Sequence, residues 1–137
     1  MRIVHSNRRR AVAAVELAVL LPFLAFIFVV AVDWCRIFYF TVTVDNCARN
    51  GALHAFDSYA LAKSPYTSMS AAALADASNL KPSPTVATAT GVDANGQQYV
   101  ECTVTYTYET ITNFPGVPRD TVITRTVRLY RAPQVPN

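Results

Sequence analysis

Residues 8–40 of the chain read RRRAVAAVELAVLLPFLAFIFVVAVDWCRIFYF. After three arginines the sequence is apolar from Ala11 to Val32, with one carboxylate, Glu16, inside the run. A helix over this run, at 1.5 Å per residue, is about 33 Å long, which matches the hydrocarbon thickness of a bilayer. Because the helix has no polar face beyond Glu16, it needs lipid or protein on every side. The stretch therefore predicts a transmembrane helix, which we assign to residues 12–40.

The charges that flank this helix predict its orientation. Four arginines lie within the first ten residues, whereas Asp33 and Arg36 cancel on the other side. By the positive-inside rule, residues 1–11 form a cytoplasmic basic leader and residues 41–137 lie outside the cytoplasm. The topology signal consists of Arg8, Arg9 and Arg10.

A cleaved secretory signal peptide is the competing interpretation of a basic start and an apolar run. Its apolar region spans only about 7–15 residues and ends at small residues. The run here is longer and ends in the bulky segment Asp33–Phe40. A retained membrane anchor is therefore favoured.

Glu16 has two interpretations that the sequence leaves open. A carboxylate near one end of an apolar span costs about 1–3 kcal/mol to insert. The side chain either reaches back to the headgroups, toward Arg10, or meets a partner charge inside the membrane.

The leader and the helix resemble the class III signal peptides of type IV pilins and pseudopilins. The shared arrangement is a basic leader, a small residue (Ala11), four more residues, Glu16 and a long apolar helix. The resemblance implies that a prepilin peptidase cuts between Ala11 and Val12, so that Glu16 becomes the fifth residue of the mature chain and acts in assembly. Ala11 stands where the family prefers glycine.

Further residues resemble the TadE-like pseudopilins of the Tad/Flp apparatus. They are a proline within the apolar helix and an Asn-x-Ala-Arg-x-Gly-Ala segment after it, namely Pro22, Asn46, Ala48, Arg49, Gly51 and Ala52. The resemblance implies a minor pseudopilin-like structural protein of the inner membrane that helps to assemble a Tad/Flp-type pilus for adherence or secretion. The implied partners are membrane lipid, a prepilin peptidase and other pilin-like or pseudopilin subunits.

The rest of the chain predicts a small α+β domain. Apolar residues at helical spacing predict an amphipathic helix over 41–62, continuous with the span and most prone to bend at Thr41–Val44. A second, short helix over 69–80 starts from Thr67 or Ser68 as N-cap. Alternating apolar residues and an Asn-Gly turn predict strands over 85–92, 98–109 and 121–131. The expected fold is pilin-like: a long N-terminal helix packed on a three-stranded antiparallel sheet.

The three cysteines suggest one cross-link. Cys47 and Cys102 both lie outside the cytoplasm on faces that can meet, so they either pair or remain free thiols. Cys35, at the membrane edge, is expected to be a buried apolar thiol. No zinc-ligand spacing is present, because there is no Cys-x-x-Cys and only two histidines.

Composition and motifs argue against other function classes. Beyond the first ten residues the chain carries eight basic and nine acidic residues, which disfavours a nucleic-acid-binding surface. No phosphate loop, metal triad or G-x-S-x-G motif occurs, so we expect no enzyme, no cofactor and no small-molecule substrate. We expect the polar residues of one helical turn, His54, Asp57 and Ser58, to lie on the protein surface without a catalytic role. The alternative function is a permanently anchored binding module that never joins a pilus. Such a module would not need its leader to be cleaved, so cleavage distinguishes the two functions.

Overall fold

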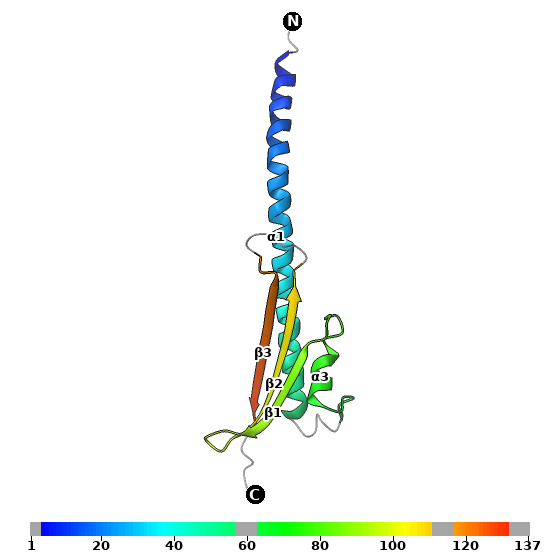
Figure 1. Ribbon diagram of the computed structural model, residues 1–137, viewed down its shortest axis with the longest axis vertical. Helices are drawn as coiled ribbons and strands as arrows, with labels where there is room; N and C mark the ends of the chain where they lie inside the picture. Colours follow the sequence, from blue (N-terminus) through cyan, green and yellow to red (C-terminus); the bar gives the residue numbers. More distant parts are fainter. Residues whose placement is uncertain (1–3, 57–62, 111–116, 132–137) are drawn as a thin grey trace.

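The computed structural model describes residues 4–56, 63–110 and 117–131. Figure 1 shows one long helix whose N-terminal half projects alone, with a small sheet and a short helix packed along its C-terminal half. We call this packed part of the chain the head. The elements are α1 (Val4–Phe56), α3 (Met69–Ala75), β1 (Thr85–Val92), β2 (Gln98–Glu109) and β3 (Asp120–Tyr130).

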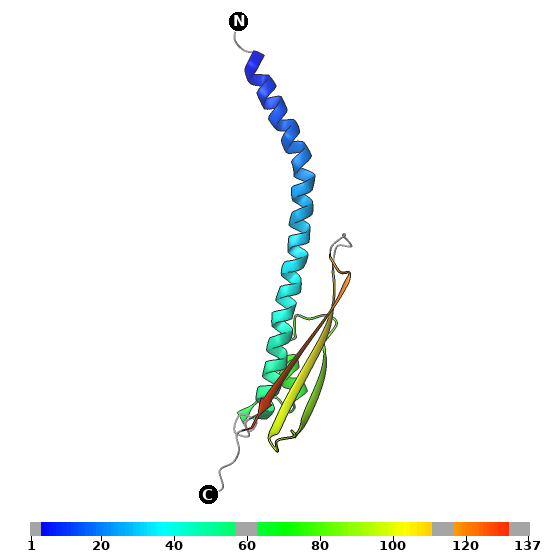
Figure 2. The ribbon, with the colours of Figure 1, turned by 90° about the vertical axis from the view of Figure 1, so that its left-hand side faces the viewer.

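Helix α1 has 53 residues and joins the predicted span to the predicted amphipathic helix without a break. It begins at Val4, inside the segment assigned to the leader. Thr41–Val44 stays helical despite its weak helix propensity, and the Thr41 hydroxyl donates a 2.8 Å hydrogen bond to the Ile37 carbonyl. Figure 2 shows that α1 curves in its N-terminal half, which contains Pro22. Proline has no N–H to donate along the helix, so it is an identifiable cause of bending.

The C-terminal end of α1 is fixed by the head. The Arg131 guanidinium donates a 2.8 Å hydrogen bond to the Ala55 carbonyl, one of the helix's terminal acceptors. The helix ends at Phe56, and the remainder of the predicted helix, residues 57–62, lies outside the described residues.

The sheet is antiparallel in the order β1-β2-β3, with β2 in the centre. The bounds of β1 and β2 coincide with the expected ranges, and β3 starts and ends one residue earlier than expected. The β1–β2 turn is built on Asp93, whose carboxylate accepts 2.9 Å hydrogen bonds from the N–H groups of Asn95 and Gln97. Gly96 takes a positive φ of 78°, which favours glycine.

The core lies between one face of β2 and one face of α1. Alternate β2 residues from Val100 to Tyr108 are buried, as the period of two requires. The facing helix residues are small: a Cβ added at Gly51 would lie 2.5 Å from the Cys102 sulfur and 3.0 Å from the Ala73 Cβ. The predicted α+β fold, a long N-terminal helix packed on a three-stranded antiparallel sheet, is confirmed.

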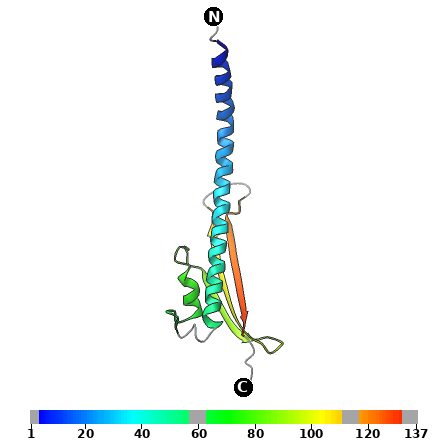
Figure 3. The same cartoon turned by 180° about the vertical axis from the view of Figure 1, so that it is seen from behind.

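Helix α3 is shorter than the predicted 69–80. Its N-cap is Ser68, whose hydroxyl accepts a 3.1 Å hydrogen bond from the Ala71 N–H. The helix ends at Ala75, and the next residues form turns whose side chains bond to α1: Asp76 contacts Asn50, and Asn79 donates to the Tyr39 hydroxyl at 2.7 Å. Figure 3 shows α3 beside the C-terminal part of α1. The predicted loop residues 111–116 and the proline-rich tail 132–137 lie outside the described residues.

Candidate functional site

The apolar part of α1 is exposed from Ala11 to Phe28 and half-buried at Val29 and Val30. It is long and apolar enough to cross a membrane, and it is the one such helix among the described residues. Large side chains stand free of the rest of the protein, including Val19 at 72 % and Phe28 at 69 % exposed. At about 25 cal/mol per Å² of apolar surface, water is an unfavourable environment for so many of them. The helix fits a single-pass membrane protein.

The predicted processing and assembly residues lie on this exposed part. Ala11, Val12 and Glu16 are all helical and exposed, and Val12 and Glu16 are four residues apart, one turn of the helix. Arg10 is also exposed, whereas the side chains of Arg8 and Arg9 are outside the described set. Cleavage after Ala11 and a role of Glu16 in assembly stay predictions.

A polar cluster marks the point where the exposed helix meets the head, and we call it the junction cluster. It consists of Asp33, Arg36 and Tyr108. Asp33 is only 2 % exposed, although it follows directly on the apolar run. The Arg36 guanidinium lies 5.3 Å from the centroid of the Tyr108 ring and 6.0 Å from that of Phe40, within cation–π range.

Two polar atoms of the junction cluster are buried without a hydrogen bond to any described residue. They are Nη1 of Arg36 and the hydroxyl of Tyr108. Burial raises the pKa of Tyr108, the nearby Arg36 charge opposes this, and Asp33 adds to it. Buried N–H and O–H groups normally have partners, so unmatched ones call for an explanation.

Sequence reasoning missed this cluster, because it treated Asp33 and Arg36 only as charges that cancel. Their spacing of three residues, at the end of an apolar run, was the available signal. It shows that both lie near one face of a helix. No pattern in the sequence indicated that Tyr108, 72 residues further on, covers that face.

The two cysteines of the head are brought into one core. Cys47 on α1 and Cys102 on β2 are both fully buried, and both are free thiols in this structure. Burial raises the pKa of each thiol, and Asp76 and Cys102 raise that of Cys47 further. The Cys47–Cys102 bond stays a prediction. Cys35 is exposed on the side of α1, so the expectation that it is buried was wrong: none of the described residues of the head covers it.

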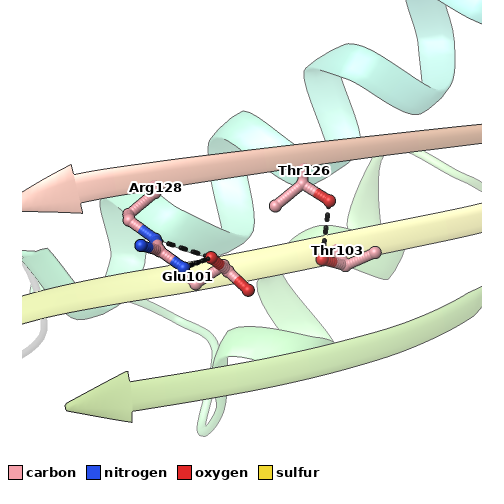
Figure 4. A network of polar contacts seen from close by, with 4 residues as sticks. All are labelled: Glu101, Thr103, Thr126 and Arg128. Atoms are coloured by element: carbon pink, nitrogen blue, oxygen red, sulfur yellow. Dashed lines mark hydrogen bonds and ion pairs between the residues drawn. The ribbon is translucent and has the colours of Figure 1, made fainter.

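The sheet face that points away from α1 is polar and cross-linked between strands. Figure 4 shows the ion pair between Arg128 of β3 and Glu101 of β2. The Oε2 atom of Glu101 lies 2.7 Å from Nε and 2.5 Å from Nη2 of Arg128. Beside this pair, the Thr103 and Thr126 hydroxyls are 2.8 Å apart. Such cross-strand pairs each stabilise a sheet modestly.

The expectation that His54 lies on a polar surface was wrong: the residue is buried, with only 7 % of its surface exposed. Its Nε2 lies 2.9 Å from the Tyr66 carbonyl, because the segment before α3 covers this end of α1. Asp57 and Ser58 lie outside the described residues. Within the described residues, no group of three or more His, Cys, Asp or Glu side chains could hold a metal ion.

An exposed apolar helix that continues into a small α+β head fits the class of single-pass membrane proteins. Within that class, residues 11–53 match the family of TadE-like proteins, which is about a third of the chain. The match covers the span, Asp33, Arg36, Cys47 and Gly51, but none of the sheet. It indicates involvement with the Tad pilus machinery and fits association with a membrane and with pilus components. No curated protein and no solved structure matches the chain.

Proposed function

We propose that the protein is a minor pseudopilin-like subunit that helps to assemble a Tad/Flp-type pilus, with a structural rather than a catalytic role. The observation that carries the proposal is the unbroken continuity of α1. One uninterrupted helix presents an exposed apolar surface with a single carboxylate, Glu16, and is fixed at its other end to the head. The TadE-like match over residues 11–53 supports the same assignment.

In this proposal the N-terminus is cytoplasmic and the head lies outside the inner membrane, as the N-terminal arginines favour. A prepilin peptidase removes the leader after Ala11 and leaves a new α-amine on Val12. That amine is one helical turn from Glu16, so in an assembly it can approach the Glu16 carboxylate of a neighbouring subunit. The resulting pilus serves adherence or secretion.

The energetics separate this role from that of a simple anchor. If the Val12 amine and Glu16 are withdrawn from water together, removing one partner costs about 3–5 kcal/mol. If Glu16 only reaches the headgroups of an isolated anchor, its replacement by leucine costs nothing and favours insertion.

The test is Glu16→Leu in cells that express the whole Tad machinery. We expect the variant to remain in the membrane fraction but to lose co-purification with the other pilin-like subunits by at least tenfold. The matched control is Glu109→Leu, which removes an exposed carboxylate from the end of β2. The control should co-purify as the wild type does.

The mass of the mature chain is read in the same preparations. A wild-type chain that begins at Val12, together with loss of assembly in Glu16→Leu, supports the pseudopilin role. An uncleaved chain, with Glu16→Leu indistinguishable from wild type, would leave the permanently anchored binding module as the better assignment.

A further inference from the structure

A groove lies on α1 where the exposed apolar helix meets the head. It has a volume of about 470 Å³, and the described residues that line it all come from one side of α1. They include Phe28, Ala31, Val32, Arg36, Tyr39 and Phe40. Their spacing of three and four residues places them on one face of the helix, so the groove runs along the helix axis.

The two ends of the groove differ in chemistry. At one end, Phe28, Ala31 and Val32 belong to the last turns of the apolar run, whose hydrocarbon surface is exposed. At the other end stands Arg36, the one charged residue among the described lining residues. At 1.5 Å per residue, Arg36 lies about 6 Å beyond Val32 along the helix axis. When the apolar run fills the hydrocarbon layer, Arg36 is therefore at the level of the lipid headgroups.

Arg36 is the residue of the groove that can bind an anion. A guanidinium carries five N–H donors, and although Nη1 of Arg36 is buried, the residue as a whole is half-buried and lines the groove. The Arg36 charge faces the rings of Tyr108 and Phe40, with the Asp33 carboxylate three residues before it on the same helix. A phosphate oxygen is the acceptor that a guanidinium binds most readily, together with carboxylate.

We propose that this groove binds one phospholipid of the leaflet that faces the head. The lipid phosphate contacts the Arg36 guanidinium, and one acyl chain lies along Phe28, Ala31 and Val32. A free phosphate ion would make no favourable contact with the apolar wall, and an uncharged apolar ligand would make no ion pair with Arg36. A phospholipid matches both ends, because its charge and its hydrocarbon are arranged in the order in which the groove offers them.

The proposal requires that α1 spans a bilayer, but it does not require assembly into a pilus. A lipid held at this point would fix the height of the head above the membrane, since Arg36 also contacts Tyr108 at the end of β2. The proposal and the pseudopilin role therefore fail independently: Glu16 variants leave the groove intact, and groove variants leave Glu16 intact.

The test measures bound lipid directly on the full chain. The protein is purified in detergent, incubated with phosphatidylglycerol, and analysed by native mass spectrometry. We expect a one-to-one complex whose occupancy falls at least fivefold in Arg36→Gln. Arg125→Gln, which removes an exposed cation of β3, is the matched control and should bind as the wild type does.

A second variant guards against loss of the fold. Ala31→Phe fills the apolar end of the groove at an exposed position of the helix, away from the head's core, and should also lower occupancy at least fivefold. Fluorescence of Trp34, the single tryptophan of the chain, reports whether the region around the junction is preserved. Arg36→Lys, which keeps the charge, should recover at least half of the binding.

Two further probes distinguish the source of the anion and the role of the apolar wall. Diacylglycerol, which lacks the phosphate, should bind at least fivefold more weakly than phosphatidylglycerol, and inorganic phosphate should not compete with the lipid. The proposal is wrong if diacylglycerol binds equally well, if inorganic phosphate displaces the lipid, or if the protein forms a lipid-free dimer that buries the groove.

Discussion

The two halves of α1 are one continuous helix but belong to different environments. In the first half, large apolar side chains such as Val19 and Leu24 are more than half exposed. In the second half, one face carries Val44, Ala48 and Ala52, each fully buried against the head. Large side chains suit contact with lipid, whereas small ones let a sheet approach the helix backbone closely. Both halves are helical, so secondary structure does not distinguish them. They differ in the size of their side chains and in what those side chains pack against.

The junction cluster lies at the border between these halves. Asp33 is the first polar residue after the apolar run, and the head buries it, with Arg36 held over the ring of Tyr108. The aromatic packing continues with Phe40, whose ring centroid is 4.8 Å from that of Tyr108 and 5.5 Å from that of Tyr106. The head is thus fastened to α1 immediately beyond the apolar run.

The largest effect should follow from a change in the closest contact of the packed half. Gly51→Val places a side chain where a Cβ alone would lie 2.5 Å from the Cys102 sulfur and 3.2 Å from the Met69 carbonyl oxygen. Overpacking of this kind typically costs about 1–3 kcal/mol, and more where backbone blocks relaxation. We expect the thermal unfolding midpoint of the head, followed by near-UV circular dichroism in detergent, to fall by at least 10 °C.

The control for this change is Ala25→Val in the exposed half, which adds a similar volume to the same helix. It should leave the unfolding midpoint within about 2 °C, because Ala25 is exposed. If both variants lower the midpoint equally, the division of α1 into an exposed and a packed half is wrong.

An effect of similar size is expected from the cysteines of the packed half. Cys47 and Cys102 are buried in one core. If the head lies outside the cytoplasm, as we propose, the two thiols can be oxidised, and we then expect them to pair in the isolated protein. Non-reducing electrophoresis should show a mobility shift that disappears in Cys102→Ser. Loss of such a bond typically costs about 2–4 kcal/mol.

Alkylation provides the opposing outcome. Because burial raises the pKa of both thiols, neither should react quickly in the folded protein, whether or not they pair. The informative sample is therefore protein denatured without reductant. Labelling of Cys47 and Cys102 in that sample would rule the bond out.

Local patterns predicted most of the fold, and long-range contacts account for what they missed. The alternation in Gln98–Glu109 predicts β2 with its bounds, because one face of the strand is buried and the other is wet. The same approach overestimated the length of α3, because the residues after Ala75 bond to α1 instead: the Asp76 carboxylate accepts a hydrogen bond from Asn50, and Asn79 donates one to Tyr39. It also placed His54 on a surface that the residues before α3 cover.

The candidate site divides in the same way. Glu16 and the cleavage position are local features of the sequence and could be predicted from it. The junction cluster could not, because Arg36 and Tyr108 meet only when β2 packs on α1. The groove lies where the exposed part of α1 meets the head, and the sequence pattern does not specify where along the helix that is.

The smallest expected effect concerns the outer face of the packed half, which should behave like the exposed half. Asp45 and Arg49 form a 3.3 Å ion pair one turn apart, with side chains 39 % and 63 % exposed. Exposed pairs of this spacing stabilise a helix by about 0.3–0.5 kcal/mol, and salt screens them. Asp45→Asn should therefore lower the unfolding midpoint of the head by only about 1–3 °C, and the difference should shrink further in 0.5 M salt. A fall as large as that of Gly51→Val would mean that this face is also packed, so that the head buries both sides of α1 rather than one.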